Sequence, residues 1–332
     1  MPSRRRHFQI EREFALALLV CSLAASAQNP SAIHVDVDLV TVPCSVTDRN
    51  GALVDGLTID DFALTDNDVP RPIKQVWRDV DLPLTVGLIV DVSGSQMGLI
   101  GKHKRTMSAF LAHVLSDRDR AFLVTVGRDV RLVTGLTNST EELQRGIDSI
   151  DQRQSSGEQL GTPCRGEGKR RFSFGCGGTA LWNGVWAASR LKMKELHGRK
   201  ALVIVSDGMD TGSKHSLTEA IEAAQGADTL VYAIKYVSTM AMAMSPAMGL
   251  ATMASHGMRR LAEETGGEQF PTPHGGPEEI FRRIENELRS QYVLAFASDD
   301  RGRDGKYHRL SVKLKRPDLQ VRARKGYYAT TL

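Results

Sequence analysis

The chain has 332 residues, enough for one large domain or two small ones, and its hydrophobic (41%) and charged (25%) fractions are typical of a soluble globular protein. The formal net charge is only +4. The densest basic runs, Arg4–Arg6 and Lys169–Arg171, are not interleaved with aromatic residues, which argues against a nucleic-acid-binding surface.

Residues 1–27 have the pattern of a signal peptide. A basic start at Arg4–Arg6 precedes the apolar run Phe14–Val20, and Ala25–Ala27 provides small residues for cleavage before Gln28. The apolar run is shorter than the roughly 20 residues that span a bilayer, and an uncleaved membrane anchor is the alternative. We therefore predict an exported protein, periplasmic or extracellular, with possible envelope association.

Export changes the interpretation of the four cysteines, because oxidising compartments favour disulfides. Cys21 would leave with the signal peptide. Cys164 and Cys176 lie in one glycine-rich loop and are predicted to form a disulfide, although two unpaired thiols are the alternative. Cys44 lies in a strand-like stretch and is predicted to be a buried free thiol.

Short strands are expected in the N-terminal region, residues 32–80. Apolar and polar residues alternate from Ile33 to Val46, and Asp48–Gly51 contains the Asn-Gly pair that is typical of a hairpin turn. Another strand, Phe62–Thr65, is followed by the turn Asp66–Asp68. No helical period is present, so this region is predicted to be part of a β-sandwich.

From Pro83 onward, strands alternate with helices. Expected strands are 84–90, 121–126, 130–133, 201–205 and 229–234, and expected helices are 100–115, 139–150, 180–196, 217–225, 259–265 and 277–289. This alternation predicts an α/β fold with a doubly wound, mostly parallel, Rossmann-like sheet over residues 82–297. The Met-rich stretch 240–258 has no firm period and is interpreted as a flexible loop or a cover over the sheet, with a partner-binding surface as the alternative. Strands near 291–297, 307–314 and 319–323 return the chain to β-structure, which suggests that strands from the two ends of the chain pair in one sandwich. As a domain, residues 298–332 are expected to pack with the N-terminal strands.

Oxygen-bearing side chains occur in three loops, two that follow expected strands and one that precedes an expected helix. Asp91, Ser93 and Ser95 come directly after the first core strand, Thr179 precedes a helix, and Asp207 follows the strand 201–205. A lone Asp-x-Ser-x-Ser is more often a turn than a site. However, ligands of open α/β sheets bind at the carboxyl ends of the strands, where these three segments are expected to meet. Two carboxylates and three hydroxyls are suitable ligands for a hard divalent cation.

The set Asp91, Ser93, Ser95, Thr179 and Asp207 resembles the metal-ion-dependent adhesion site of von Willebrand factor type A domains. The surrounding "GGTAL" and "VSDG" fit that pattern, and "DLPLTVGLIVDVSGS", "GLTIDDFALTDN" and "RKGYYA" are similar to a secreted von Willebrand A-related family prominent in acidobacteria. The resemblance implies that Ser93, Ser95 and Thr179 contact the ion by hydroxyl, and that Asp91 and Asp207 bind directly or through water. It also implies Mg²⁺ (or Mn²⁺ or Ca²⁺) as the ion and a protein partner that presents an Asp or Glu carboxylate.

Enzyme interpretations fit less well. A haloacid-dehalogenase-like phosphatase needs a second Asp where this chain has Ser93, and a serine hydrolase needs a Gly-x-Ser-x-Gly elbow that neither Ser93 nor Ser95 provides. We therefore expect a non-enzymatic, exported, cation-dependent protein-binding module for adhesion or assembly. Two alternatives remain: an envelope assembly protein whose metal site only stabilises the fold, and a metal-dependent hydrolase. Asp210 and Thr211 follow Asp207 closely, and little is expected of them as supporting groups.

Overall fold

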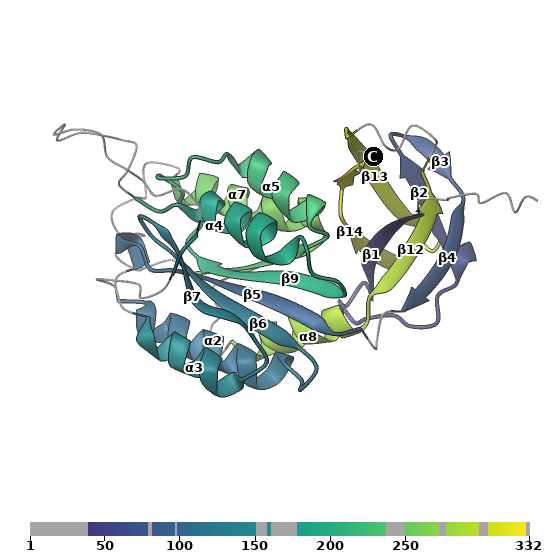
Figure 1. Cartoon of the computed structure of the whole chain (residues 1–332). Helices are drawn as coiled ribbons and strands as arrows, with labels where there is room; N and C mark the ends of the chain where they lie inside the picture. Colours follow the sequence, from purple (N-terminus) through teal and green to yellow (C-terminus); the bar gives the residue numbers. More distant parts are fainter. Residues whose placement is uncertain are drawn as a thin grey trace, which may run out of the picture. The chain divides into compact units, whose positions relative to one another are not determined.

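A computed structural model describes residues 39–78, 82–96, 98–150, 158–160, 178–236, 250–271, 277–298 and 305–329, which belong to one unit of the chain (Figure 1). The expected signal peptide, the Cys164–Cys176 pair and residues 240–249 of the Met-rich stretch lie outside these ranges. Within them, no helix combines the length and the apolar character that crossing a membrane requires.

A seven-stranded sheet forms the centre of the α/β part, in the order β11-β10-β9-β5-β6-β7-β8. The strands are β5 (Leu84–Asp91), β6 (Arg120–Val126), β7 (Val130–Thr137), β8 (Glu158–Gln159), β9 (Arg199–Ser206), β10 (Leu230–Lys235) and β11 (Gln269–Phe270). Five of them, β5, β6, β9, β10 and β11, are parallel. β7 is antiparallel to β6, because a turn of three residues is too short for a parallel crossover.

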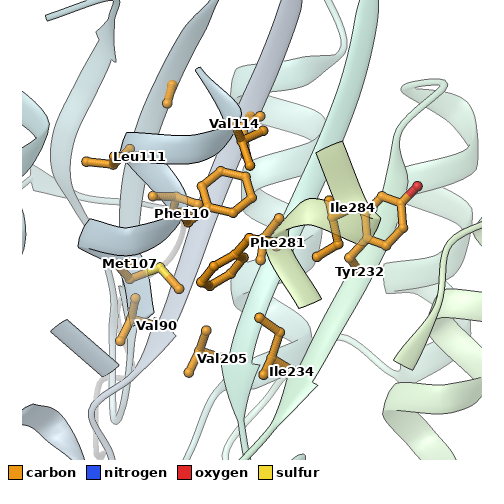
Figure 2. Close-up of a cluster of buried hydrophobic side chains, with 14 of the residues drawn as sticks. Val90, Met107, Phe110, Leu111, Val114, Val205, Tyr232, Ile234, Phe281 and Ile284 are labelled. Atoms are coloured by element: carbon orange, nitrogen blue, oxygen red, sulfur yellow. The ribbon is translucent and has the colours of Figure 1, made fainter. Parts of the chain in front are cut away.

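Helices cover both faces of this sheet (Figure 1). On one face lie α2 (Ile100–Val114), α3 (Thr140–Ser149) and α8 (Glu278–Arg289), and on the other lie α4 (Leu181–Ala187), α5 (Leu217–Gly226) and α7 (Leu250–Thr265). α4 continues into a π-helical turn, Ala188–Met193. Figure 2 shows Phe110 and Phe281 next to each other in the first layer. Their rings meet edge to face, with an interplanar angle of 80° and centroids 5.3 Å apart. The two layers bury both faces of β5.

One helix is longer than its sequence pattern predicted. α7 begins at Leu250, whereas the expected start was Arg259, so part of the Met-rich stretch is helical. Gly257 and the small residues shortly before it, Ala251, Ala254 and Ser255, weaken the local helical pattern. Gly257 is tolerated in the helix because α7 passes close to α4, where a Cβ at this position would lie 3.0 Å from Cζ2 of Trp182.

The strands from both ends of the chain form a β-sandwich. One sheet has the order β14-β1-β12-β4 and the other β15-β13-β2-β3. Their bounds are β1 (Leu39–Asp48), β2 (Phe62–Asp66), β3 (Val69–Arg71), β4 (Ile73–Arg78), β12 (Tyr292–Ala297), β13 (Tyr307–Leu314), β14 (Leu319–Ala323) and β15 (Gly326–Tyr328), with a 3₁₀ turn at Ile59–Asp61. The expected fold class, a doubly wound sheet with a sandwich of terminal strands, is confirmed. β12 lies inside the range 82–297, yet its hydrogen-bonding partners are β1 and β4 of the sandwich.

Cys44 faces the interior of the sandwich. It is 1% exposed and is a free cysteine that packs with Phe62 and Tyr292 in one apolar cluster. Burial raises the pKa of its thiol to about 12. Cys44 therefore acts as a small apolar residue in this core, as the sequence predicted.

A charged network joins the sandwich to the α/β part. The guanidinium of Arg322, on β14, donates to Glu268 after α7 and to Glu287 on α8. Glu287 is only 5% exposed and also accepts a hydrogen bond from Oγ of Ser45 at 3.0 Å. Arg324 adds a 2.5 Å contact with Asp228. The carboxylate of Glu287 is thus stabilised by partners from two strands of the sandwich.

We expect Glu287→Ala to lower the free energy of unfolding by about 2 kcal/mol, because it leaves Oγ of Ser45 without its acceptor and Arg322 with Glu268 alone of its two carboxylate partners. Urea unfolding monitored by circular dichroism measures this loss. Glu279→Ala, at an exposed position of the same helix, is the control and should change stability by about 0.5 kcal/mol or less. Equal losses in the two variants would contradict a stabilising role for this network.

Candidate metal site

Asp91 is the last residue of β5 and is fully buried. Its Oδ1 accepts a hydrogen bond from the backbone N–H of Ser93 at 2.9 Å, and its Oδ2 accepts one from Oγ of Ser206 at 2.5 Å. Burial raises the pKa of Asp91 to about 6, the hydrogen bonds from Ser206 and Ser93 oppose this shift, and the nearby Asp207 carboxylate adds to it. The carboxylate is therefore incompletely compensated by the protein alone.

Ser93 and Ser95 lie in the loop that leaves β5. The chain turns into a short 3₁₀ segment, Gly94–Gln96, which brings the two hydroxyl oxygens to 3.1 Å from each other. Ser93 is half-buried and Ser95 is exposed. The two hydroxyls thus lie together and can be reached from solvent, close to the carboxylate of Asp91.

Asp207 follows β9, the strand beside β5 in the sheet. It is 5% exposed, and its Oδ1 accepts a hydrogen bond from the backbone N–H of Met209 at 2.9 Å. Its Oδ2 accepts one from Nε2 of Gln96 at 2.6 Å. From β5 the chain goes first to β6 on one side and later to β9 on the other, so these strand ends form the switch point of the sheet. That topology brings Asp91 and Asp207 together.

Thr179 is held in the loop before α4 and is 4% exposed. Its backbone N–H donates to Oγ1 of Thr211 at 3.1 Å, and its carbonyl accepts hydrogen bonds from the N–H groups of Thr211 and Gly212, both at 3.0 Å. The next residue, Ala180, donates to the carbonyl of Gly127 in the β6–β7 turn at 2.8 Å. Thr179 is thereby fixed to the loop that carries Asp207.

Several residues that matter here were missed, or given little weight, by the sequence interpretation. Ser206 and Gln96 contact the two carboxylates, and Thr211 holds the Thr179 backbone. Asp210 accepts hydrogen bonds from Trp182 N–H at 3.2 Å and from Oγ of Ser213 at 2.5 Å, so it caps the start of α4. The dense run of hydroxyls and carboxylates in "SDGMDTGS", residues 206–213, was the available signal.

The residues present fit a hard divalent cation. No group of three or more His, Cys, Asp or Glu that could hold a metal is found in the described ranges, so hydroxyl oxygens would have to complete any site here. The buried carboxylate of Asp91 is incompletely compensated, with the Asp207 carboxylate close to it. The buried Oε1 of Gln96 has no hydrogen-bond partner in the described ranges. An oxygen-only set of this kind favours Mg²⁺, Mn²⁺ or Ca²⁺ over softer ions.

No protein-family model and no curated protein matches this chain. Similar solved structures include the conserved hypothetical protein BatB from Bacteroides thetaiotaomicron, at 14% identity and a TM-score of 0.45 over 62% of this chain and 100% of that one. A von Willebrand factor type A protein from Catenulispora acidiphila is 13% identical, with a TM-score of 0.43 over 84% and 75% of the two chains.

A third similar structure is proximal thread matrix protein 1 from the mussel byssus, solved with zinc in its metal-ion-dependent adhesion motif. It is 13% identical, with a TM-score of 0.45 over 67% of this chain and 49% of that chain. The resemblance to von Willebrand factor type A domains is thus found again among solved structures, at the level of the fold. Identities and TM-scores this low do not indicate what this chain binds.

Proposed function

We propose that this protein is an exported, divalent-cation-dependent protein-binding module that acts in adhesion or assembly. The observation that carries the proposal is the pair of buried carboxylates, Asp91 and Asp207, held at the switch point of the sheet beside the hydroxyls of Ser93 and Ser95. The pattern of residues 1–27 supports export to the periplasm or the exterior, with possible envelope association.

The donor set supports binding of a partner's carboxylate. Asp91 and Asp207 together balance the charge of a divalent ion, and the hydroxyls of Ser93, Ser95 and Thr179 supply neutral oxygens without further negative charge. Because these ligands give the ion no excess negative charge, an open coordination position on a bound ion can still attract an Asp or Glu carboxylate from a partner. The exposure of Ser95 supports access for such a group. Mg²⁺ is the proposed ion, with Mn²⁺ and Ca²⁺ as alternatives.

A non-enzymatic role is part of the proposal. A nucleophilic serine needs a general base within hydrogen-bond reach. The hydroxyl of Ser93 lies beside that of Ser95 and near the carboxylate of Asp91, which is proposed to bind the ion rather than to transfer protons. The strongest competing function is structural: because Asp91 and Asp207 are almost entirely buried, an ion held between them would also stabilise the fold without any partner.

Binding of purified protein to a library of C-terminally amidated peptides tests the proposal, with Asp or Glu fixed at the central position and no acidic residue at the other, randomised positions. We expect binding in Mg²⁺, loss of binding in EDTA, and no binding to the matched library with central Asn or Gln. Calorimetric titration with Mg²⁺ alone is the companion measurement. Mg²⁺ binding without any carboxylate-dependent peptide binding would favour the structural alternative, and the absence of Mg²⁺ binding would refute the site.

A further inference from the structure

Gln96 occupies an unusual position for an uncharged polar residue. It ends the 3₁₀ segment after Ser95, it is fully buried, and it is not among the ligands that the sequence resemblance implies. Its Nε2 donates to Oδ2 of Asp207 at 2.6 Å, which links two loops whose residues are 111 positions apart. Its Oε1 is also buried and has no hydrogen-bond partner in the described part of the chain.

The orientation of this amide is fixed by charge. Nε2 must face Asp207, because turning the amide over would place its carbonyl oxygen against a carboxylate. Covalent geometry separates Oε1 from Nε2 by about 2.2 Å, so Oε1 lies within about 5 Å of Oδ2 of Asp207. A buried acceptor without a partner costs about 1–3 kcal/mol. The protein thus retains a costly acceptor directly beside the site carboxylate of Asp207.

We propose that Gln96 is a further residue of the cation site. Its N–H group orients Asp207, and its Oε1 supplies an oxygen to the ion or to water bound to the ion. This inference rests on the proposed cation-dependent function and adds a residue to the same site. Glutamine suits both tasks because it carries a donor and an acceptor without adding a third negative charge. Methionine would supply neither group, and glutamate would repel Asp207.

Calorimetric titration of the purified protein with Mg²⁺ tests this proposal. We expect Gln96→Met to weaken Mg²⁺ binding at least tenfold while the far-ultraviolet circular dichroism stays that of wild type. Gln225→Met is the matched control: Gln225 is also buried (3% exposed), and its Nε2 donates to the carbonyl of Glu264, on α7 rather than at the site. It should bind Mg²⁺ within twofold of wild type, even if it loses stability.

A second variant separates a direct role from a structural one. Gln96→Glu should raise the affinity for Ca²⁺ relative to Mg²⁺ several-fold, because Ca²⁺ accommodates more carboxylate oxygens. The variant Gln96→Glu also keeps the test possible if Gln96→Met fails to fold, because a bound cation can offset the repulsion between the introduced carboxylate and Asp207. A folded Gln96→Met with wild-type Mg²⁺ affinity, or a Gln96→Glu with an unchanged ratio of Ca²⁺ to Mg²⁺ affinity, would overturn the role of Gln96 alone. Wild-type protein that binds neither ion would overturn the proposed function as well.

Discussion

Asp91→Asn should reduce Mg²⁺ affinity at least a hundredfold and leave a folded protein that is more stable than wild type in EDTA at neutral pH. Asparagine has nearly the same shape, and its Oδ1 still accepts the hydrogen bond from the N–H of Ser93. It removes one of the two carboxylates that balance the charge of the ion, which accounts for the loss of binding. It also removes a buried charge that Asp207 repels, which accounts for the gain in stability.

The pH dependence of this gain follows from the pKa of Asp91. Without an ion, burial raises this pKa from 3.8 to about 6, so the folded protein holds the proton more tightly than the unfolded chain. The wild-type protein therefore loses stability as the pH rises from about 4 to about 6, and the loss is complete at pH 7. Linkage sets its upper limit at about 3 kcal/mol. The asparagine side chain has no charge to bury, so the variant keeps its stability over this range.

Thermal unfolding in EDTA at pH 4.5 and pH 7, and again in Mg²⁺, measures the effect. The advantage of Asp91→Asn should be large in EDTA at pH 7, small at pH 4.5, and reversed in Mg²⁺. Asp129→Asn, in the β6–β7 turn, is the control and should change neither Mg²⁺ binding nor its pH dependence. An Asp91→Asn protein that is less stable than wild type in EDTA at pH 7 would show that the carboxylate is well compensated without an ion.

The fold could be predicted because its signals are local. The apolar run Leu84–Val90 identifies a strand buried on both faces, and the alternation of strands and helices after it identifies the doubly wound sheet. The partner of a strand is not a local property. The order of elements suggests that the strand Tyr292–Ala297 belongs with the terminal strands, but its own residues do not indicate that its partner is β1, some 250 residues earlier, rather than the seven-stranded sheet that precedes it.

The site also combines residues that a local sequence pattern identifies with residues that only the tertiary structure identifies. Asp91, Ser93 and Ser95 are close in sequence, and their spacing carries a recognisable pattern. Gln96 and Ser206 are recognisable only once β5 and β9 lie side by side, because Gln96 contacts Asp207 just after β9 and Ser206 contacts Asp91 at the end of β5. Polar residues that hydrogen-bond to the site carboxylates have no characteristic sequence spacing, because their partners are set by the tertiary structure.

Gly178→Ala should weaken Mg²⁺ binding at least tenfold and lower the free energy of unfolding by about 2–4 kcal/mol. Gly178 has a φ of +129°, a conformation that residues with a side chain rarely adopt. A Cβ here would lie 1.9 Å from Oγ1 of Thr211, the atom that accepts the hydrogen bond from Thr179 N–H. Alanine must therefore displace the group that fixes Thr179, which disturbs the site as well as the fold.

Gly94→Ala is the matched control, because Gly94 lies between Ser93 and Ser95 with no positive φ, and a methyl group added there would have no atom within 4 Å. It should retain Mg²⁺ binding within threefold of wild type. The double variant Gly178→Ala, Thr211→Ala separates the two effects of the clash. Removing Oγ1 of Thr211 relieves the 1.9 Å contact, leaves only the 2.9 Å contact with its Cβ under 3.0 Å, and should restore part of the stability. Mg²⁺ binding should stay weak because the N–H of Thr179 has lost its acceptor. Wild-type Mg²⁺ affinity in Gly178→Ala would mean that the position of Thr179 does not control the site.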